Sequence, residues 1–195
     1  MSNIRDLKNR LRAELRAARE ALTPEQKTAL DQAILKQFRS LASFRFAEIL
    51  LAYYPLDDEI NILPLIEEAL RMGKRVALPR CHEGNRMDFY FITSLDDVES
   101  GAYGINEPKT SCELYDLTET KPAVMLIPAL SYDKFGYRLG YGRGYYDRYV
   151  NRFNGVKAGL CYRAFLKDAP LPRGKFDMAV DYIVTEKGVK LVEKK

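Results

Sequence analysis

The residue types best suited to chemistry gather in one segment, residues 136–149, which reads Gly-Tyr-Arg-Leu-Gly-Tyr-Gly-Arg-Gly-Tyr-Tyr-Asp-Arg-Tyr. Its alternating glycines are Gly140, Gly142 and Gly144. Because they lack side chains, they leave the backbone open to close approach by a ligand. Arg138 and Arg143 add guanidinium groups suited to phosphate oxygens, and the carboxylate of Asp147 could hold a magnesium ion against those phosphates. The segment therefore predicts a site for nucleotide phosphates.

The glycine-rich loop matches neither of the two common phosphate-binding patterns. It lacks the Gly-x-x-x-x-Gly-Lys-Ser/Thr of a P-loop and the Gly-x-Gly-x-x-Gly spacing of dinucleotide-binding folds. Alternating glycines that lead into a helix can still present several backbone N–H groups to an anion. Taken alone, this loop is equally well interpreted as a phosphate loop or as a tight structural turn.

RNA binding is a second class of function to weigh, because Arg, Gly and Tyr interleave here and the chain is mildly basic. Arg143-Gly144-Tyr145 begins like an RRM signature, but Tyr146-Asp147-Arg148 departs from it. Asp147 would also repel a phosphate backbone unless a metal intervened. We therefore expect no nucleic-acid partner.

The totals describe an ordinary globular protein. The chain has 195 residues, 47% hydrophobic and 30% charged, and we expect a single α/β catalytic domain over residues 1–195. No apolar stretch approaches the ~18–20 residues that span a bilayer, so we expect no membrane association. The charged residues 1–12 do not resemble a signal peptide.

The cysteines and the histidine exclude several kinds of site. Cys81, Cys112 and Cys161 form no CxxC pair, which favours reduced thiols in the cytoplasm over a disulfide framework or a zinc ribbon. His82 is the only histidine, so a Ser-His-Asp mechanism is improbable and a site with several histidines is impossible.

The net charge of +4 hides an uneven distribution along the chain. Residues 40–133 are acidic, whereas the segments before and after them are basic. If the fold brings the basic segments together, they would attract a polyanionic ligand. Solvated helix faces are the plainer explanation, and charge alone favours it.

Short apolar runs and amphipathic helices alternate along the chain and must position these residues. We expect helices over residues 3–21, from Thr23-Pro24 with a capping box to Gln26, from Asn61 to about Gly73, and over 145–153. We expect strands at 47–54, 75–79, 87–92, 123–127, 156–161 and 179–184, with 93–121 largely loop. This alternation predicts a layered α/β/α fold with a mostly parallel sheet and helices on both faces.

Ligands of such sheets bind beyond the carboxyl ends of the strands. The segments 54–59, 128–144 and 162–177 should meet there. Lys8 and Arg12 are four residues apart, so they project from one side of the first helix. Their default interpretation is surface charge. For Asp177, a place on one strand face together with Asp181 and ordinary surface exposure are equally good interpretations. The acidic run Asp57–Glu59 could equally be a cluster at a helix entry.

Several of these segments together resemble one known family. Arg138–Asp147, preceded by Pro128–Gly136, is similar to the signature of the 5-formyltetrahydrofolate cyclo-ligase (5,10-methenyltetrahydrofolate synthetase) family. The likeness runs from Lys8 to about Asp181. It includes Lys8-x-x-Leu11-Arg12, Asp58-Glu59, Leu78-Pro79-Arg80 with Met87, Gly104-Ile105-x-Glu107-Pro108, and Leu171-Pro172 with Asp177.

The resemblance implies an enzyme that converts 5-formyltetrahydrofolate to 5,10-methenyltetrahydrofolate with Mg²⁺ and ATP, releasing ADP and phosphate. It implies a sheet similar to the ribose-5-phosphate isomerase and CoA-transferase group. Implied ATP contacts are Lys8, Asn9, Arg10, Leu11, Arg12, Arg138, Leu139, Gly140, Tyr141, Gly142, Arg143, Gly144, Tyr145 and Tyr146. Implied folate contacts are Tyr54, Glu59, Tyr141, Gly142, Arg143, Gly144 and Tyr145. The implied metal ligands are Asp147 and Asp177, and the implied catalytic cations are Lys8, Arg138 and Arg143.

Three positions depart from the family pattern. The family often has Gln where this chain has Phe165, His where it has Phe176, and Gly or Lys where it has Arg143. The resemblance otherwise implies a cytoplasmic monomer that acts on a small folate, with or without a polyglutamate tail. A sugar-phosphate isomerase or an acyl-transferase on the same sheet is the alternative, and it would need no ATP.

Overall fold

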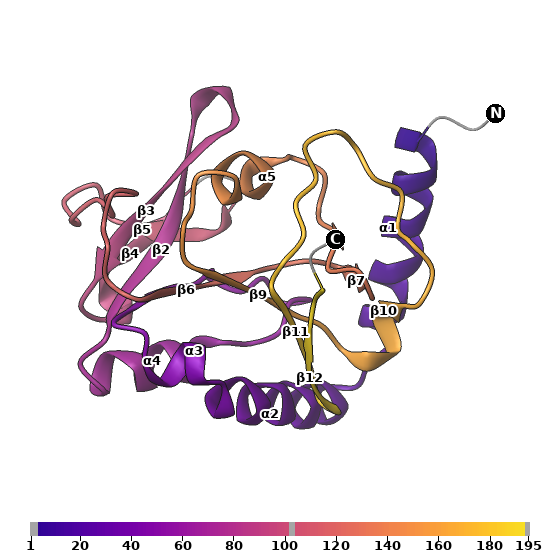
Figure 1. Ribbon diagram of the computed structural model, residues 1–195, viewed down its shortest axis with the longest axis horizontal. Helices are drawn as coiled ribbons and strands as arrows, with labels where there is room; N and C mark the ends of the chain where they lie inside the picture. The colour runs from indigo at the N-terminus through magenta and orange to yellow at the C-terminus, as the bar shows by residue number, and fades with distance from the viewer. Residues whose placement is uncertain (1–3, 102–103, 194–195) are drawn as a thin grey trace.

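The protein is built around a twisted central sheet (Figure 1), in a computed structural model that describes residues 4–101 and 104–193. Within these residues the sheet has seven strands, in the order β12 (Gly188–Leu191), β11 (Tyr182–Thr185), β9 (Val156–Leu160), β6 (Ala123–Ile127), β1 (Ile49–Leu51), β2 (Arg75–His82) and β3 (Arg86–Ile92). The inner strands pair in parallel, and the edge strands β12 and β3 pair antiparallel to their neighbours. The predicted mostly parallel α/β sheet is confirmed.

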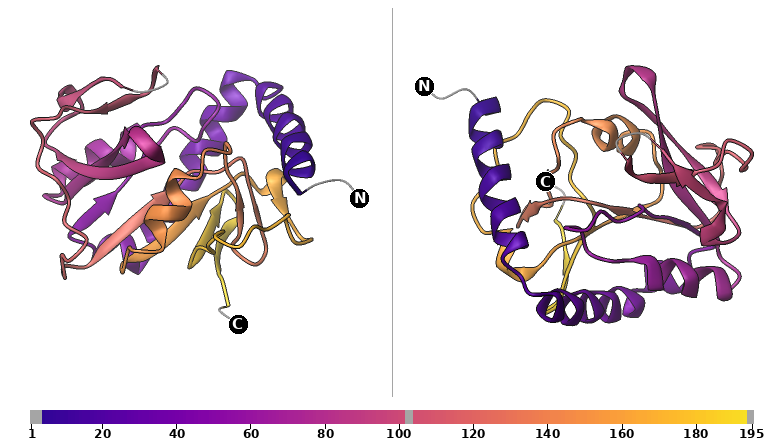
Figure 2. Two further views of the ribbon diagram at one scale, coloured as in Figure 1. Left: turned by 90° about the horizontal axis from the view of Figure 1, so that it is seen from above. Right: turned by 180° about the vertical axis from the view of Figure 1, so that it is seen from behind.

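Helices lie on both faces of this sheet, as the sequence predicts. They are α1 (Ile4–Glu20), α2 (Pro24–Ser40), α3 (Ala42–Arg45), α4 (Leu63–Arg71) and α5 (Tyr145–Val150). Helices α2, α3 and α4 cover one face, α5 lies on the opposite face, and α1 stands at one side of the molecule (Figures 1 and 2). No helix in the described part of the chain combines the length and the apolar character that a bilayer crossing requires.

The starts of the helices follow from local chemistry. The Thr23 hydroxyl accepts the N–H of Gln26, whose side-chain oxygen accepts the N–H of Thr23, which confirms the capping box. The expected cap at Asn61 is one residue off: Ile62 is the N-cap of α4, and the Asn61 side chain accepts the N–H of Leu63 instead. The prediction of a helix over 3–21 agrees with α1, and residue 3 lies outside the described residues.

The core fills the space between the sheet and its helices. All residues of β1 are fully buried, because helices and loops cover both faces of this central strand. Phe38 and Ile34 of α2 are equally buried, as are Leu65 and Ile66 of α4. This packing fixes the strands whose carboxyl ends carry the candidate site.

Several boundaries differ from the sequence-based expectation. Strand β1 ends at Leu51, β2 continues to His82 because it pairs with β3 along its length, and α5 ends at Val150. The region expected to be loop contains a short hairpin of β4 (Val98–Ser100) and β5 (Asn106–Pro108). One-turn 3₁₀ helices occur at Glu83–Asn85, Leu95–Asp97 and Arg163–Phe165.

A small second sheet, which the sequence did not predict, supports the glycine-rich segment. It consists of β10 (Leu166–Lys167), β7 (Ser131–Asp133) and β8 (Arg138–Leu139), in that order. The Tyr132 ring packs so closely on Gly159 of β9 that a Cβ there would lie 2.3 Å from it. The Tyr132 hydroxyl also donates to the carbonyl of Ile127 at 2.7 Å. The small sheet is thereby fixed to the large one.

Candidate active site

A cavity of about 580 Å³ lies where the chain leaves the carboxyl ends of β1 and β6. Its wall includes Tyr54 and Glu59 after β1, Pro128 after β6, and Asp177 from the segment before β11. The three segments expected to meet beyond the sheet therefore contribute to one wall. The glycine-rich loop 140–144 and part of α1 complete it.

Helix α1 and the glycine-rich loop are held together by Arg12. Its Nε donates to the carbonyl of Gly140 at 2.8 Å, and its Nη1 donates to the side chain of Asn9 at 2.8 Å. Gly142 has φ of +102°, and a Cβ there would lie 3.1 Å from the Arg12 guanidinium carbon. Glycine is therefore needed at 142 both for its backbone conformation and for the close approach of this arginine.

Two ion pairs join the cations of the cavity to the acids predicted as metal ligands. Lys8 Nζ lies 2.6 Å from Asp177 Oδ2, which also accepts the N–H of Gly174 at 2.8 Å. Arg138 Nη2 donates to Asp147 Oδ1. The Arg138 side chain is nearly buried, and its Nη1 has no hydrogen-bond partner among the described residues. A buried donor without a partner is costly, so Arg138 is suited to an anionic ligand.

Most of the predicted nucleotide residues lie in the cavity wall. Besides Lys8, Arg12 and Arg138, they are Leu139, Gly140, Tyr141, Gly142, Arg143, Gly144, Tyr145 and Tyr146. Arg143 is exposed, so it stands at the rim. Asn9, Arg10 and Leu11 do not line the cavity: Asn9 and Arg10 are exposed, and Leu11 packs against the core.

A further acid in the cavity wall is Glu59, which is only 6% exposed. Burial, with a smaller contribution from the nearby charge of Asp58, raises the pKa of Glu59 from 4.5 to about 7. The N–H of Leu56 donates to Glu59 Oε2 at 2.9 Å and partly opposes this effect. Tyr54, another of the predicted folate residues, also lines the cavity.

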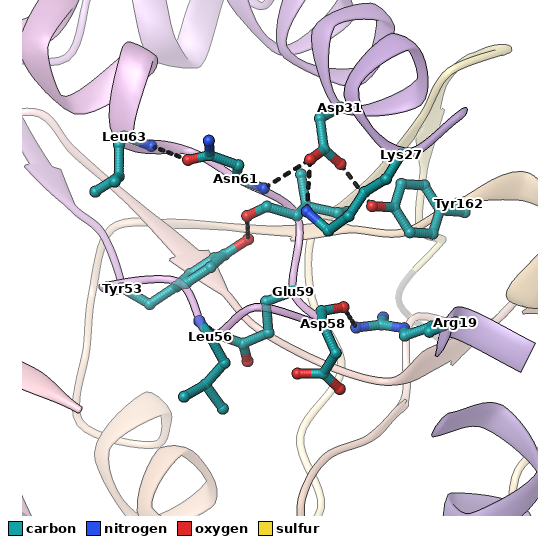
Figure 3. A network of polar contacts seen from close by, with 11 residues as sticks. Arg19, Lys27, Asp31, Tyr53, Leu56, Asp58, Glu59, Asn61, Leu63 and Tyr162 are labelled. Atoms are coloured by element: carbon teal, nitrogen blue, oxygen red, sulfur yellow. Dashed lines mark hydrogen bonds and ion pairs between the residues drawn. The ribbon is translucent and has the colours of Figure 1, made fainter. Parts of the chain in front are cut away.

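A buried network behind Glu59 fixes the turn that carries it (Figure 3). Asp31 of α2 accepts the Tyr162 hydroxyl at 2.6 Å, the Lys27 ammonium at 2.8 Å and the N–H of Asn61 at 3.1 Å. The Tyr53 hydroxyl donates to the carbonyl of Ile60 at 3.1 Å. The turn is therefore tied to α2 and, through Asp31, to Tyr162, two residues after the end of β9.

Sequence reasoning assigned no site role to several residues of the wall. They are Arg16, Tyr53, Leu56, Pro79, Cys81, Met87, Ile105, Asn106, Glu107 and Pro128. Glu107 is 4% exposed and accepts the N–H of Cys81 at 3.1 Å. Burial, helped by Glu107, raises the pKa of the Cys81 thiol to about 11, so this thiol stays protonated near neutrality. Two signals were available: Pro79, Met87, Ile105, Glu107 and Pro128 belong to segments that match the family pattern, and Leu56 and Pro128 lie in segments expected to meet beyond the sheet.

The donor set fits a magnesium ion that bound phosphate would help to hold. Among the described residues there is no group of three or more acidic, cysteine or histidine side chains that could enclose a metal. Asp147 and Asp177 both line the cavity, however. Mg²⁺ commonly takes one or two carboxylates, with substrate phosphates and water as the other ligands.

Comparison with known proteins agrees with this arrangement. A sequence model of the 5-formyltetrahydrofolate cyclo-ligase family matches residues 4–186. The chain belongs to this family. It is 28% identical to the 5-formyltetrahydrofolate cyclo-ligase of Escherichia coli K12, across 88% of this chain and 96% of that protein. It is 26% identical to a probable 5-formyltetrahydrofolate cyclo-ligase of Caenorhabditis elegans, across 95% and 96%.

Solved structures give the same result for the fold. The 5,10-methenyltetrahydrofolate synthetase of Aquifex aeolicus superposes with a TM-score of 0.83 at 32% identity, covering 97% of this chain and 94% of that one. The 5,10-methenyltetrahydrofolate synthetase of Mycoplasma pneumoniae superposes with a TM-score of 0.73 at 24% identity, covering 92% and 98%. The cyclo-ligase family membership confirms the resemblance and the expectation of a ligase. The predicted likeness to the ribose-5-phosphate isomerase and CoA-transferase group stays a prediction.

Proposed function

We propose that this chain is an ATP- and magnesium-dependent cyclo-ligase that converts 5-formyltetrahydrofolate to 5,10-methenyltetrahydrofolate and releases ADP and phosphate. One observation supports this activity independently of family membership. A single cavity joins a glycine-rich loop and three cations, Lys8, Arg12 and Arg138, to the buried carboxylate of Glu59. The cavity thus offers one end suited to phosphates and another suited to a neutral heterocycle with N–H groups.

At the phosphate end, the cations neutralise and orient the triphosphate. Arg138 supplies an unpartnered buried donor, Arg12 reaches the loop from α1, and Lys8 of the same helix pairs with Asp177. Arg143 at the rim adds a further positive charge. Asp147 and Asp177 would hold Mg²⁺, which supplies charge neutralisation to the phosphate oxygens.

At the folate end, Glu59 accepts hydrogen bonds from the amino and ring N–H groups of the pterin. Tyr54 and Tyr145 offer aromatic surface with polar tips. The cavity of about 580 Å³ lies within the usual range for small-molecule sites, which supports a folate ring system beside the terminal phosphate.

The chemistry explains why both ends are needed. An N-formyl group is an amide and a poor electrophile, so its oxygen must become a leaving group before the ring can close. Transfer of the γ-phosphoryl group to that oxygen gives an iminium phosphate. The folate N10 then attacks the carbon, and phosphate leaves together with the N10 proton. The protein contributes positioning and charge stabilisation.

Two further features belong to the same proposal. The whole chain acts as one catalytic domain, which is supported by a continuous hydrophobic core that extends from Leu15 to Val192. The enzyme works in the cytoplasm, which is supported by cysteines that are all unpaired thiols.

A spectroscopic assay tests this function directly. Purified protein is mixed with 5-formyltetrahydrofolate and Mg²⁺, and methenyl-folate absorbance is followed with and without ATP. We expect product only with ATP, in equal amount to ADP. Product without ATP, or none with it, would contradict the proposal. A sugar-phosphate isomerase or an acyl-transferase would show no dependence on the nucleotide.

A further inference from the structure

Asp58, the residue immediately before Glu59, contacts the glycine-rich loop through its side chain. Its Oδ1 and Oδ2 accept the Tyr141 hydroxyl at 3.0 and 2.9 Å. The Arg16 guanidinium lies 5.2 Å from the centre of the Tyr141 ring. Tyr141 is therefore held between α1 and the turn that carries Glu59. Because the acceptor is a carboxylate, this hydrogen bond is of the stronger, charge-assisted kind.

The main chain of Asp58 is fixed separately from its side chain. Its carbonyl accepts Arg19 Nη1 at 3.0 Å (Figure 3). Arg19 is 4% exposed, and its Nη2 also donates to the carbonyls of Ala129 and Leu130, just after β6. A substitution that shortens the Asp58 side chain leaves this backbone anchor in place. The contribution of the contact with Tyr141 can therefore be measured in a folded protein.

This inference rests on the proposed function, in which the two elements connected by Asp58 bind different ligands. In that function the loop of Tyr141 contacts phosphate, Tyr141 itself reaches both nucleotide and folate, and Glu59 contacts the pterin. Any movement of the loop that alters the position of the Tyr141 hydroxyl acts on Asp58, and through the chain on its neighbour Glu59. A movement of the turn that carries Glu59 acts in the same way on Tyr141 and the loop, because coupling between two binding sites is reciprocal.

We propose that Asp58 is a positioning residue that, through Tyr141, fixes the nucleotide loop against the turn carrying Glu59, so that nucleotide and folate each bind more tightly in the presence of the other. Asp58 itself contacts neither reacting group.

Calorimetry on the full chain tests the coupling. The affinity for a magnesium complex of a non-hydrolysable ATP analogue is measured with and without saturating 5-formyltetrahydrofolate. We expect ~10-fold tighter binding with folate in the native protein. Asp58→Ala and Tyr141→Phe should each reduce this ratio to about 2 or less, and the double variant should reduce it no further.

Two further variants separate coupling from general damage. Asp58→Asn keeps a side-chain acceptor and should recover part of the ratio. Asp57→Ala removes the exposed neighbouring carboxylate and should retain the full ratio. Damage to the fold would lower both affinities and the melting temperature while leaving the ratio unchanged. Should Asp58→Ala fail to fold, Tyr141→Phe carries the same test.

The remaining outcomes separate failure of the coupling role of Asp58 from failure of the proposed function. If the native protein binds both ligands with a ratio near one, or if Asp58→Ala and Tyr141→Phe keep the native ratio, the coupling role of Asp58 is wrong and the proposed function stands. If the native protein binds neither ligand, the proposed function is wrong, and this inference fails with it.

Discussion

Replacing Glu59 with glutamine should make the protein more stable at alkaline pH, because the buried carboxylate no longer has to ionise. The pKa of Glu59 lies at about 7 in the folded chain against 4.5 for the ordinary group. Between these values the folded protein keeps a proton that the unfolded chain has released. The free energy of unfolding therefore falls as pH rises from about 4.5 through about 7.

The two pKa values set the size of the effect. A difference of about 2.5 in pKa corresponds to about 3 kcal/mol, most of which is lost between about pH 5 and about pH 8. Glu59→Gln preserves the shape and an acceptor for the N–H of Leu56, and it has no charge to bury. Relative to this variant, the native protein should lose about 2–3 kcal/mol of unfolding free energy over that interval.

Urea unfolding of both proteins at each pH measures the effect. Glu67→Gln, which removes an exposed carboxylate of α4, is the matched control and should follow the native profile. Parallel profiles for the native protein and Glu59→Gln would refute the argument, since they would mean that Glu59 is ionised in the folded chain at acid pH as well. The same variant should weaken folate use while ATP binding persists, so the site residue is retained at the expense of stability.

Other substitutions test the phosphate end. Arg138→Ala should slow methenyl-folate formation by ~10²–10³-fold, as loss of one preorganised charge-stabilising donor does, and a near-native rate would remove Arg138 from that role. Asp147→Asn should raise the magnesium concentration needed for half-maximal rate; an unchanged requirement would reassign this carboxylate. Gly142→Ala should cost ~1–3 kcal/mol of unfolding free energy, because its φ of +102° is strained for alanine and its Cβ meets Arg12. Gly140→Ala, where a Cβ meets nothing within 4 Å, should cost much less, and equal losses would contradict the steric argument.

The large sheet could be predicted because its strands are short apolar runs between amphipathic helices. Strand Ala123–Ile127 was predicted to the residue, since five apolar side chains end at a proline that cannot continue the ladder. The run Ala47–Tyr54 looked like one strand, yet pairing ends near Ala52. Tyr53 and Tyr54 are apolar enough to extend the pattern, but they line the cavity instead.

The elements that sequence reasoning missed are stabilised by contacts distant in the chain. Strand β8 has two residues, Arg138 and Leu139, and gains its strand character from pairing with β7. Strand β12 begins at Gly188 and is largely exposed, so it shows no alternation of buried and exposed positions. Such elements carry too few residues for a periodic pattern, and their partners decide their conformation.

The sequence indicated which residue types would form the candidate site, but not how they are arranged in space. The glycine-rich segment indicated phosphate chemistry from its own residues. Nothing local could reveal that Lys8 pairs with Asp177, 169 positions away, or that Tyr141 bonds to Asp58. The nearly complete burial of Glu59 was equally hidden, because the sequence around it reads as an exposed acidic turn.

The ion pairs Lys8–Asp177 and Arg138–Asp147 bear on how a charged substrate enters. Under the proposed function, a triphosphate that takes Lys8 would displace Asp177, whereas Arg138 could bind phosphate through its free Nη1 and keep its bond to Asp147. The accompanying Mg²⁺ would then give the displaced carboxylate a new partner. Under the proposed function, this exchange of partners would favour entry of the metal and its nucleotide as one preformed complex over the arrival of each in turn.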